Sequence, residues 1–150
     1  DFVFSGKNMD FFLQPINLGL LAIALISGAL LVRQVVQPGG KSVSPQVAIA
    51  LTDKEGGVLV DVREEHEVAV EHIQGSQFIP LKELPGQIAK LEKYRKKPVV
   101  VVCAAGQRSA AACRLLNKAG FENVSQIEGG IQAWEKAGLP LKRGKAPAKA

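Results

Sequence analysis

The sequence predicts an α/β fold: a parallel β-sheet with helices on both faces, preceded by one N-terminal transmembrane helix. Two observations lead to this prediction. Short apolar runs such as "VLVDV" and "VVVVC" alternate with helical patterns along residues 43–141, which is typical of strands buried between two layers of helices. Ahead of them lies an apolar segment that is long enough to cross a bilayer.

The transmembrane helix is predicted at residues 11–32, a run of 22 residues without a charged side chain. As a helix this run would measure about 33 Å, against about 30 Å for the hydrocarbon core of a bilayer. A buried core helix and a signal peptide are the alternatives. Apolar residues on every face from Leu18 to Val32 disfavour the first, and the scarcity of cations ahead of the run disfavours the second. We therefore expect a single-pass membrane anchor.

The charges that flank the anchor predict its orientation. Arg33 and Lys41 follow it, whereas only Lys7 precedes it. By the positive-inside rule, the domain that follows is expected in the cytoplasm. Residues 1–10 are an N-terminal extension. Because "MDFF" at Met9 would begin the anchor cleanly, the residues before Met9 are expected to be upstream or added sequence.

The net charge of +5 belongs to the end of the chain and not to the domain. Residues 41–140 carry 13 basic and 12 acidic side chains, whereas the last ten residues carry four basic and no acidic ones. A nucleic-acid partner is not expected, because that function needs clustered cations on a folded surface. Residues 33–42, with Pro, Gly and Ser, are predicted to be a linker, and residues 142–150 a basic disordered tail.

The domain between them, residues 43–141, is predicted element by element from its hydrophobic pattern. Gly120 marks the end of the helix that follows Cys103, and Ser109 is a candidate cap for the start of that helix. Ligands of parallel sheets bind at the carboxyl ends of the strands, and Cys103 lies at such an end. The predicted strands are 58–62, 78–80, 99–103 and 124–127, and the predicted helices are 45–54, 64–71, 83–94, 109–119 and 130–137.

Cys103 stands where two features favour a negatively charged sulfur. The N-terminus of the following helix carries a partial positive charge, and the small residues Ala104, Ala105 and Gly106 let successive backbone N–H groups curl around one atom. Arg108 adds a cation and planar donors for an oxyanion. The alternative is that Cys103 is a small buried hydrophobe that completes its strand. The glycine, the arginine and the helix start argue against that alternative.

The cysteine and histidine content limits the other chemistry of the chain. Cys103 and Cys113 are its two cysteines, ten positions apart, which makes neither a disulfide framework nor a zinc-ligand pattern. His66 and His72 are isolated and do not complete a metal site. No metal and no cofactor are therefore expected.

Three motifs resemble those of rhodanese-type sulfurtransferases. The stretch "CAAGQR" is similar to the active-site loop of that family, with a glycine three and an arginine five positions after the cysteine. Upstream, "VLVDVREEHEVAVEHIQGSQFIPL" resembles the first signature of the family, and downstream "IEGGIQAW" resembles its closing motif. The resemblance covers about residues 43–141, and the whole chain resembles a membrane-anchored single-domain rhodanese.

The resemblance implies a sulfurtransferase that works through a covalent intermediate. Cys103 would take the outer sulfur of a small sulfur donor as a persulfide and pass it to a thiol or a cyanide-like acceptor. An acceptor protein or a membrane protein is a further candidate partner. Backbone N–H groups of the loop would hold the charge of the persulfide, so the implied substrate-binding residues are Ala104, Ala105, Gly106, Gln107, Arg108 and Ser109.

The remaining motif residues are interpreted as support. Asp61 and Arg63 are expected to form an ion pair of the scaffold, and His72 to fix a loop through a hydrogen bond in preference to transferring a proton. Trp134 is expected in the core. Cys113 is interpreted as a packing residue, with a resolving thiol as the alternative.

The sequence departs from the pattern of the family at a few positions. Glu71 stands where the family usually has glycine, and Ser76 where it usually has alanine. Ala104 and Ala105 occupy loop positions that often carry polar or basic side chains in the family. Because those side chains help to hold thiosulfate, we expect thiosulfate to be a poor donor.

Two other functions remain open. A phosphatase or arsenate reductase of the same fold also uses a cysteine followed by an arginine, but the phosphatase relatives have a seven-residue loop, and Cys103 to Arg108 spans six residues. A binding module, which belongs to a different class, would position a partner at the membrane with secondary or no catalysis. The intact Cys103 argues against an inactive module.

Overall fold

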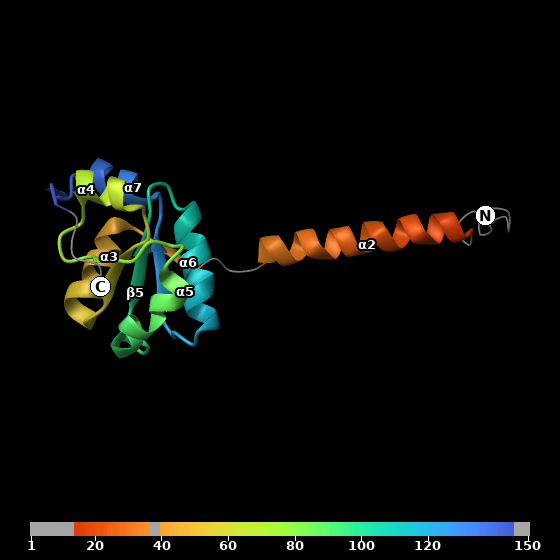
Figure 1. Cartoon of the computed structure of the whole chain (residues 1–150), viewed down its shortest axis with the longest axis horizontal. Helices are drawn as coiled ribbons and strands as arrows, with labels where there is room; N and C mark the ends of the chain where they lie inside the picture. Colours follow the sequence, from red (N-terminus) through yellow and green to blue (C-terminus); the bar gives the residue numbers. More distant parts are fainter. Residues whose placement is uncertain (1–13, 37–39, 146–150) are drawn as a thin grey trace, which may run out of the picture. The chain divides into compact units, whose positions relative to one another are not determined.

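The structure, a computed structural model, describes residues 14–36 and 40–145. The chain divides into two compact units between residues 37 and 38. The first unit holds helix α2, and the second is an α/β domain (Figure 1). This boundary falls inside the predicted linker, residues 33–42.

Helix α2 (Pro15–Val36) is apolar on every side from Leu18 to Val32. Its stretch Pro15–Val32 is long and apolar enough to cross a membrane, and none of that stretch is buried. This confirms one candidate apolar helix ahead of the domain, a feature that membrane anchors share with signal sequences. The helix runs past the predicted end at Val32 because the next residues, "RQVV", include no helix breaker. The start of the predicted segment, residues 11–13, lies outside the described residues.

The domain is built on a five-stranded sheet in the order β1-β6-β5-β2-β4. All neighbouring strands run parallel, so the prediction of a parallel sheet is confirmed. The central strand, β5, pairs with β2 on one side and with β6 on the other. The strands are β1 (Lys41–Val43), β2 (Val58–Asp61), β4 (Gln77–Phe78), β5 (Val99–Val102) and β6 (Val124–Ile127).

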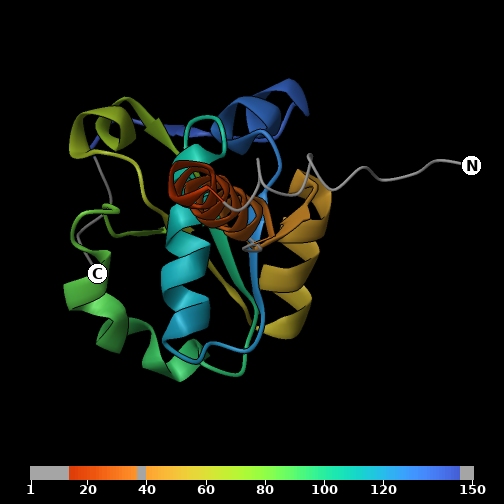
Figure 2. The same cartoon turned by 90° about the vertical axis from the view of Figure 1, so that its right-hand side faces the viewer.

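Helices cover both faces of this sheet, as the sequence predicts (Figure 2). Helices α3 and α7 contribute to the core on one face, and α5, η1 and α6 contribute to the core on the other. Their bounds are α3 (Pro45–Glu55), α4 (Glu65–Val70), α5 (Leu84–Gln87), the 3₁₀ helix η1 (Ile88–Tyr94), α6 (Gln107–Lys118) and α7 (Gly130–Lys136).

The four valines of β5 show why this pattern of residues gives a central strand. Val99 and Val101 pack into the core beneath α6, and Val100 and Val102 pack into the core beneath α3 and α7. All four are fully buried. A strand that is covered on both faces needs apolar residues at every position, and β-branched side chains suit it best. Cys103, the next residue, falls on the α6 side of the sheet.

Two predicted elements differ in detail from the structure. The helix predicted at 83–94 is a short α-helical turn, α5, followed by η1. Pro85 and Gly86 explain the break, because proline offers no backbone N–H and glycine is a weak helix former. The strand predicted at 78–80 is Gln77–Phe78, since Pro80 has no N–H to contribute to a ladder.

Short strands at both ends of the domain were not predicted. Strand β7 (Lys142–Arg143) pairs antiparallel with β3 (Glu71–His72), so the prediction of a disordered tail over 142–150 is wrong at its start. Residues 146–150 of that tail lie outside the described residues. Strand β1 likewise begins inside the predicted linker, residues 33–42. Strands of two or three residues form because a distant partner strand is available, which a local pattern does not reveal.

Candidate active site

The candidate site begins where strand β5 ends. Cys103 follows Val102 and is 1% exposed. The backbone N–H of Gly106 donates a hydrogen bond to the sulfur of Cys103, with a distance of 2.9 Å between nitrogen and sulfur. A backbone amide that points at a sulfur atom offsets negative charge on that atom. The loop therefore suits a thiolate or a persulfide.

Gly106 gives the loop its shape. Its φ angle is 112°, a left-handed conformation that glycine adopts without strain, and helix α6 begins at the next residue, Gln107. The prediction that Ser109 caps this helix is therefore wrong, because the helix starts two residues earlier. Ser109 lies in the first turn, fully buried. Among the described residues, its Oγ has no hydrogen-bond partner.

The closing motif "IEGGIQAW" supports the Cys103 loop from the other side. The backbone N–H of Ile131 donates to the carbonyl oxygen of Cys103 at 2.8 Å. Gly130 packs so closely on the loop that a Cβ there would contact the carbonyl oxygen of Cys103 and lie 2.7 Å from that of Ala104. Trp134 is buried, as expected, and donates from Nε1 to the carbonyl oxygen of Pro140 at 3.1 Å. The start of α7 thus fixes the backbone at the cysteine.

Arg108 does not stand free in the loop. Its Nη1 and Nη2 atoms donate to the two carboxylate oxygens of Glu67 at 2.6 and 2.8 Å. The hydrogen bond to Arg108 is the main reason why the pKa of Glu67 falls to about 2, and the same bond raises the pKa of Arg108. The sequence analysis identified Arg108 but not Glu67. The two residues are 41 positions apart, and no local spacing relates them.

Glu67 is fixed at the same time by its own helix. The backbone N–H of Glu64 donates to Oε2 of Glu67 at 2.8 Å, and the two residues form a capping box at the start of α4. A capping box satisfies backbone groups that the first helical turn leaves unpaired. The carboxylate of Glu67 therefore joins α4 to the start of α6.

Asp61 and Arg63 form a second, deeply buried ion pair. Nη2 of Arg63 lies 2.8 Å from Oδ2 of Asp61, and the two side chains are 4% and 0% exposed. Nη2 of Arg63 also donates to the carbonyl oxygen of Glu71 at 2.8 Å. Buried charges are tolerated only when they are paired and hydrogen-bonded, as both are here. This pair ties the end of β2 to the segment after α4.

His72 and Cys113 are both buried away from solvent. Nδ1 of His72 donates to the carbonyl oxygen of Val68 at 3.1 Å, which fixes the turn at the end of α4. The thiol of Cys113 contacts the carbonyl oxygen of Ser125 at 3.6 Å. Burial raises the pKa of Cys113 to about 12. A thiol in that environment is a poor nucleophile.

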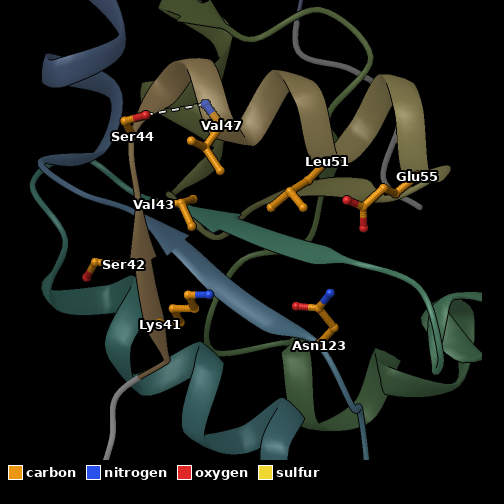
Figure 3. Close-up of a pocket in the computed structure, with 8 residues that line it drawn as sticks. All are labelled: Lys41, Ser42, Val43, Ser44, Val47, Leu51, Glu55 and Asn123. Atoms are coloured by element: carbon orange, nitrogen blue, oxygen red, sulfur yellow. Dashed lines mark hydrogen bonds between the residues drawn. The ribbon is translucent and has the colours of Figure 1, made fainter.

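A groove of about 490 Å³ lies elsewhere on the domain, between the edge strand β1 and helix α3 (Figure 3). The residues that line this groove are Lys41, Ser42, Val43, Ser44, Val47, Leu51, Glu55 and Asn123. None of the residues from Cys103 to Ser109 is among them.

In the part of the chain that the structure describes, no three His, Cys, Asp or Glu side chains are grouped to hold a metal ion.

Comparison with known proteins identifies the family. Residues 44–137 match the rhodanese-like domain family. The chain is 34% identical over 99 residues to a thiosulfate sulfurtransferase GlpE of Actinobacillus pleuropneumoniae. This alignment covers 66% of this chain and 90% of that protein. It is 35% identical over 98 residues to a sulfurtransferase of Allochromatium vinosum, covering 65% of this chain and 90% of that one.

A solved structure shows the same relationship. The crystal structure of a thiosulfate sulfurtransferase from Pseudomonas aeruginosa superposes with a TM-score of 0.63 and 28% sequence identity. The match covers 71% of this chain and 21% of that chain. The protein belongs to the rhodanese-like family, and its relatives include sulfurtransferases.

The close approach of Gly130 to the loop gives a first prediction. We expect Gly130→Ala to lower the free energy of unfolding by about 2–4 kcal/mol, since a left-handed φ and a backbone clash act together. The matched control is Gly138→Ala. Gly138 also has a left-handed φ, 70°, but a Cβ there meets nothing within 4 Å, so only the backbone strain of about 1 kcal/mol remains. Urea unfolding curves of both variants measure the difference, and equal losses would contradict the packing described here.

The Glu67–Arg108 pair predicts a specific dependence of stability on pH. Because the folded state lowers the pKa of Glu67 from 4.5 to about 2, the pair stabilises the fold fully above about pH 4.5, and this contribution is lost as the pH falls towards 2. Partial exposure reduces its size to about 1–2 kcal/mol. We expect the stability difference between the natural protein and Glu67→Gln to shrink between about pH 5 and pH 3. A stability difference that stays constant over this pH range would contradict a contribution of the Glu67–Arg108 pair to the pH dependence of stability.

Proposed function

We propose that the protein is a sulfurtransferase that carries sulfur as a persulfide on Cys103. The observation that supports this most directly is the 2.9 Å hydrogen bond from the Gly106 N–H to the sulfur of Cys103. The sulfur thus lies at a strand end, against an amide loop and at the start of a helix, where a thiolate is stabilised. The sulfurtransferases among the relatives support the same function.

The reaction has two steps. In the first, the thiolate of Cys103 attacks the outer sulfur of a donor, a new S–S bond forms, and the donor's own bond to that sulfur breaks. The electron pair of the broken bond leaves with the remainder of the donor, for example as sulfite when the donor is thiosulfate. In the second, a thiolate or cyanide acceptor attacks the outer sulfur of the persulfide and releases Cys103 as a thiolate, which completes the cycle.

The loop supplies the electrostatic part of this catalysis. Backbone N–H groups from Ala104 to Ser109 hold the charge of the outer sulfur, as an oxyanion hole does. Their positions are fixed before the reaction by Gly106 and by the Ile131–Cys103 hydrogen bond. Asp61, Arg63 and His72 act at a distance, by holding β2 and α4 in place. No metal or cofactor takes part in this scheme.

We further propose that α2 anchors the enzyme to a membrane as a single span, with the domain in the cytoplasm. The uncharged stretch Pro15–Val32 supports the span, and the cations Arg33 and Lys41 after it support the orientation. The acceptor is then a thiol, a protein cysteine or a cyanide-like anion that reaches the membrane surface. A membrane protein is one such candidate partner.

The proposed chemistry predicts different effects for the two cysteines. Cys103→Ser should abolish the formation of thiocyanate from a sulfane donor and cyanide, because the nucleophile is lost. Cys113→Ser should keep most of the activity, since Cys113 is buried with a pKa of about 12. The assay is thiocyanate production above the uncatalysed rate. Loss of activity in a well-folded Cys113→Ser, together with an active Cys103→Ser, would show that Cys113 carries the sulfur and would contradict the proposal.

The proposed anchor predicts the behaviour of the chain in membranes. The full chain should resist extraction by alkaline carbonate, whereas a shortened chain that begins at Gly40, just before β1, should be soluble and active. In right-side-out vesicles the domain should be protected from added protease until the vesicles are lysed. Release of the full chain by carbonate would contradict a spanning helix. Digestion of the domain in unlysed vesicles would show the opposite orientation.

A further inference from the structure

The loop that holds Cys103 has one cation, and that cation is already paired. Between Cys103 and Ser109 the only charged side chain is Arg108. Both of its Nη atoms are used by Glu67, at 2.6 and 2.8 Å. The two side chains are 32% and 25% exposed, so the pair is partly shielded from water. Two parallel charged hydrogen bonds of this kind are strong and fix the orientation of the guanidinium.

The pair presents no net charge to an incoming anion. A pKa of about 2 keeps Glu67 ionised at every physiological pH, so its negative charge always offsets that of Arg108. The capping bond from the Glu64 N–H holds the carboxylate in place. For Arg108 to turn towards a donor, it would have to give up both bonds to Glu67.

A second arginine close to Glu67, Arg63, is also engaged. Arg63 is bound to Asp61 and to the carbonyl oxygen of Glu71. An anion at Cys103 therefore meets the backbone N–H of Gly106, while Arg108 and Arg63 are each already paired with a carboxylate. Amides that converge on one sulfur suit a single negative charge, whereas a dianion needs a further positive charge to compensate for lost hydration.

We propose that Glu67 sets the charge selectivity of the enzyme for its sulfur donor. By holding Arg108 in a neutral pair, Glu67 disfavours dianionic donors such as thiosulfate and leaves sulfane donors with one negative charge as the preferred class. Glu67 is thus a positioning residue that acts through Arg108. This inference rests on the proposed sulfurtransferase function.

The test uses two donors that differ by one charge. Thiosulfate is a dianion, and methanethiosulfonate has the same bond to its outer sulfur with a methyl group in place of one anionic oxygen. Cyanide is the acceptor for both. The quantity measured is the ratio of kcat/KM for thiosulfate to kcat/KM for methanethiosulfonate, which a general loss of folding or of active enzyme would not change.

Four variants are compared with the full-length natural protein. Glu67→Gln frees the charge of Arg108 and should raise the ratio by about tenfold, through a lower KM for thiosulfate. Arg108→Gln leaves the carboxylate unpaired and should lower the ratio by about tenfold. The double variant Glu67→Gln/Arg108→Gln removes both charges and should restore the natural ratio. Glu65→Gln, which removes an exposed charge two residues from Glu67, is the matched control and should leave the ratio unchanged.

The rise in the ratio expected for Glu67→Gln carries the proposal, and an unchanged ratio in a folded Glu67→Gln would overturn it. The double variant tests whether this effect acts through Arg108, in which case it shows the natural ratio. A ratio about tenfold below the natural one in the double variant would also overturn the proposal, since Arg108 would then serve the donor in spite of Glu67. Failure of the natural protein to transfer sulfur from either donor would instead contradict the proposed function itself.

Discussion

The hydrogen bond from the Gly106 N–H to the sulfur of Cys103 is the contact on which the arrangement of this site depends. It requires a strand that ends at Val102, a glycine in a left-handed conformation and a helix that starts at the next residue. Buried valines fix the strand, and the Ile131–Cys103 hydrogen bond fixes the loop from behind. The site is therefore formed largely by backbone groups, which explains how small loop residues can provide it.

Charged side chains around the loop are used to hold elements together. The Asp61–Arg63 pair joins β2 to the segment after α4, and the Glu67–Arg108 pair joins α4 to α6. Because each of these two arginines has a carboxylate partner, the positive charge offered to a substrate comes mainly from amides and from the N-terminus of α6. A site of this kind stabilises one charge at one atom, which is what a persulfide presents.

Much of this arrangement follows from the sequence. The apolar runs at β2, β5 and β6 predict the sheet, and the motif at Cys103 predicts the loop, because both depend on residues that are adjacent in the chain. Contacts between distant segments could not be predicted in that way. The Glu67–Arg108 pair and the β3–β7 pairing each join residues separated by 40 or more positions. The start of α6 was misplaced because Gly106 caps it by conformation, whereas Ser109 had the expected side chain.

Mass spectrometry of the intact protein, purified without reductant and then incubated with methanethiosulfonate, tests the central claim most directly. The account predicts the mass of one additional sulfur atom, which dithiothreitol removes and which maps to the peptide that contains Cys103. Absence of the added sulfur from a folded protein, or its location on Cys113, would contradict it.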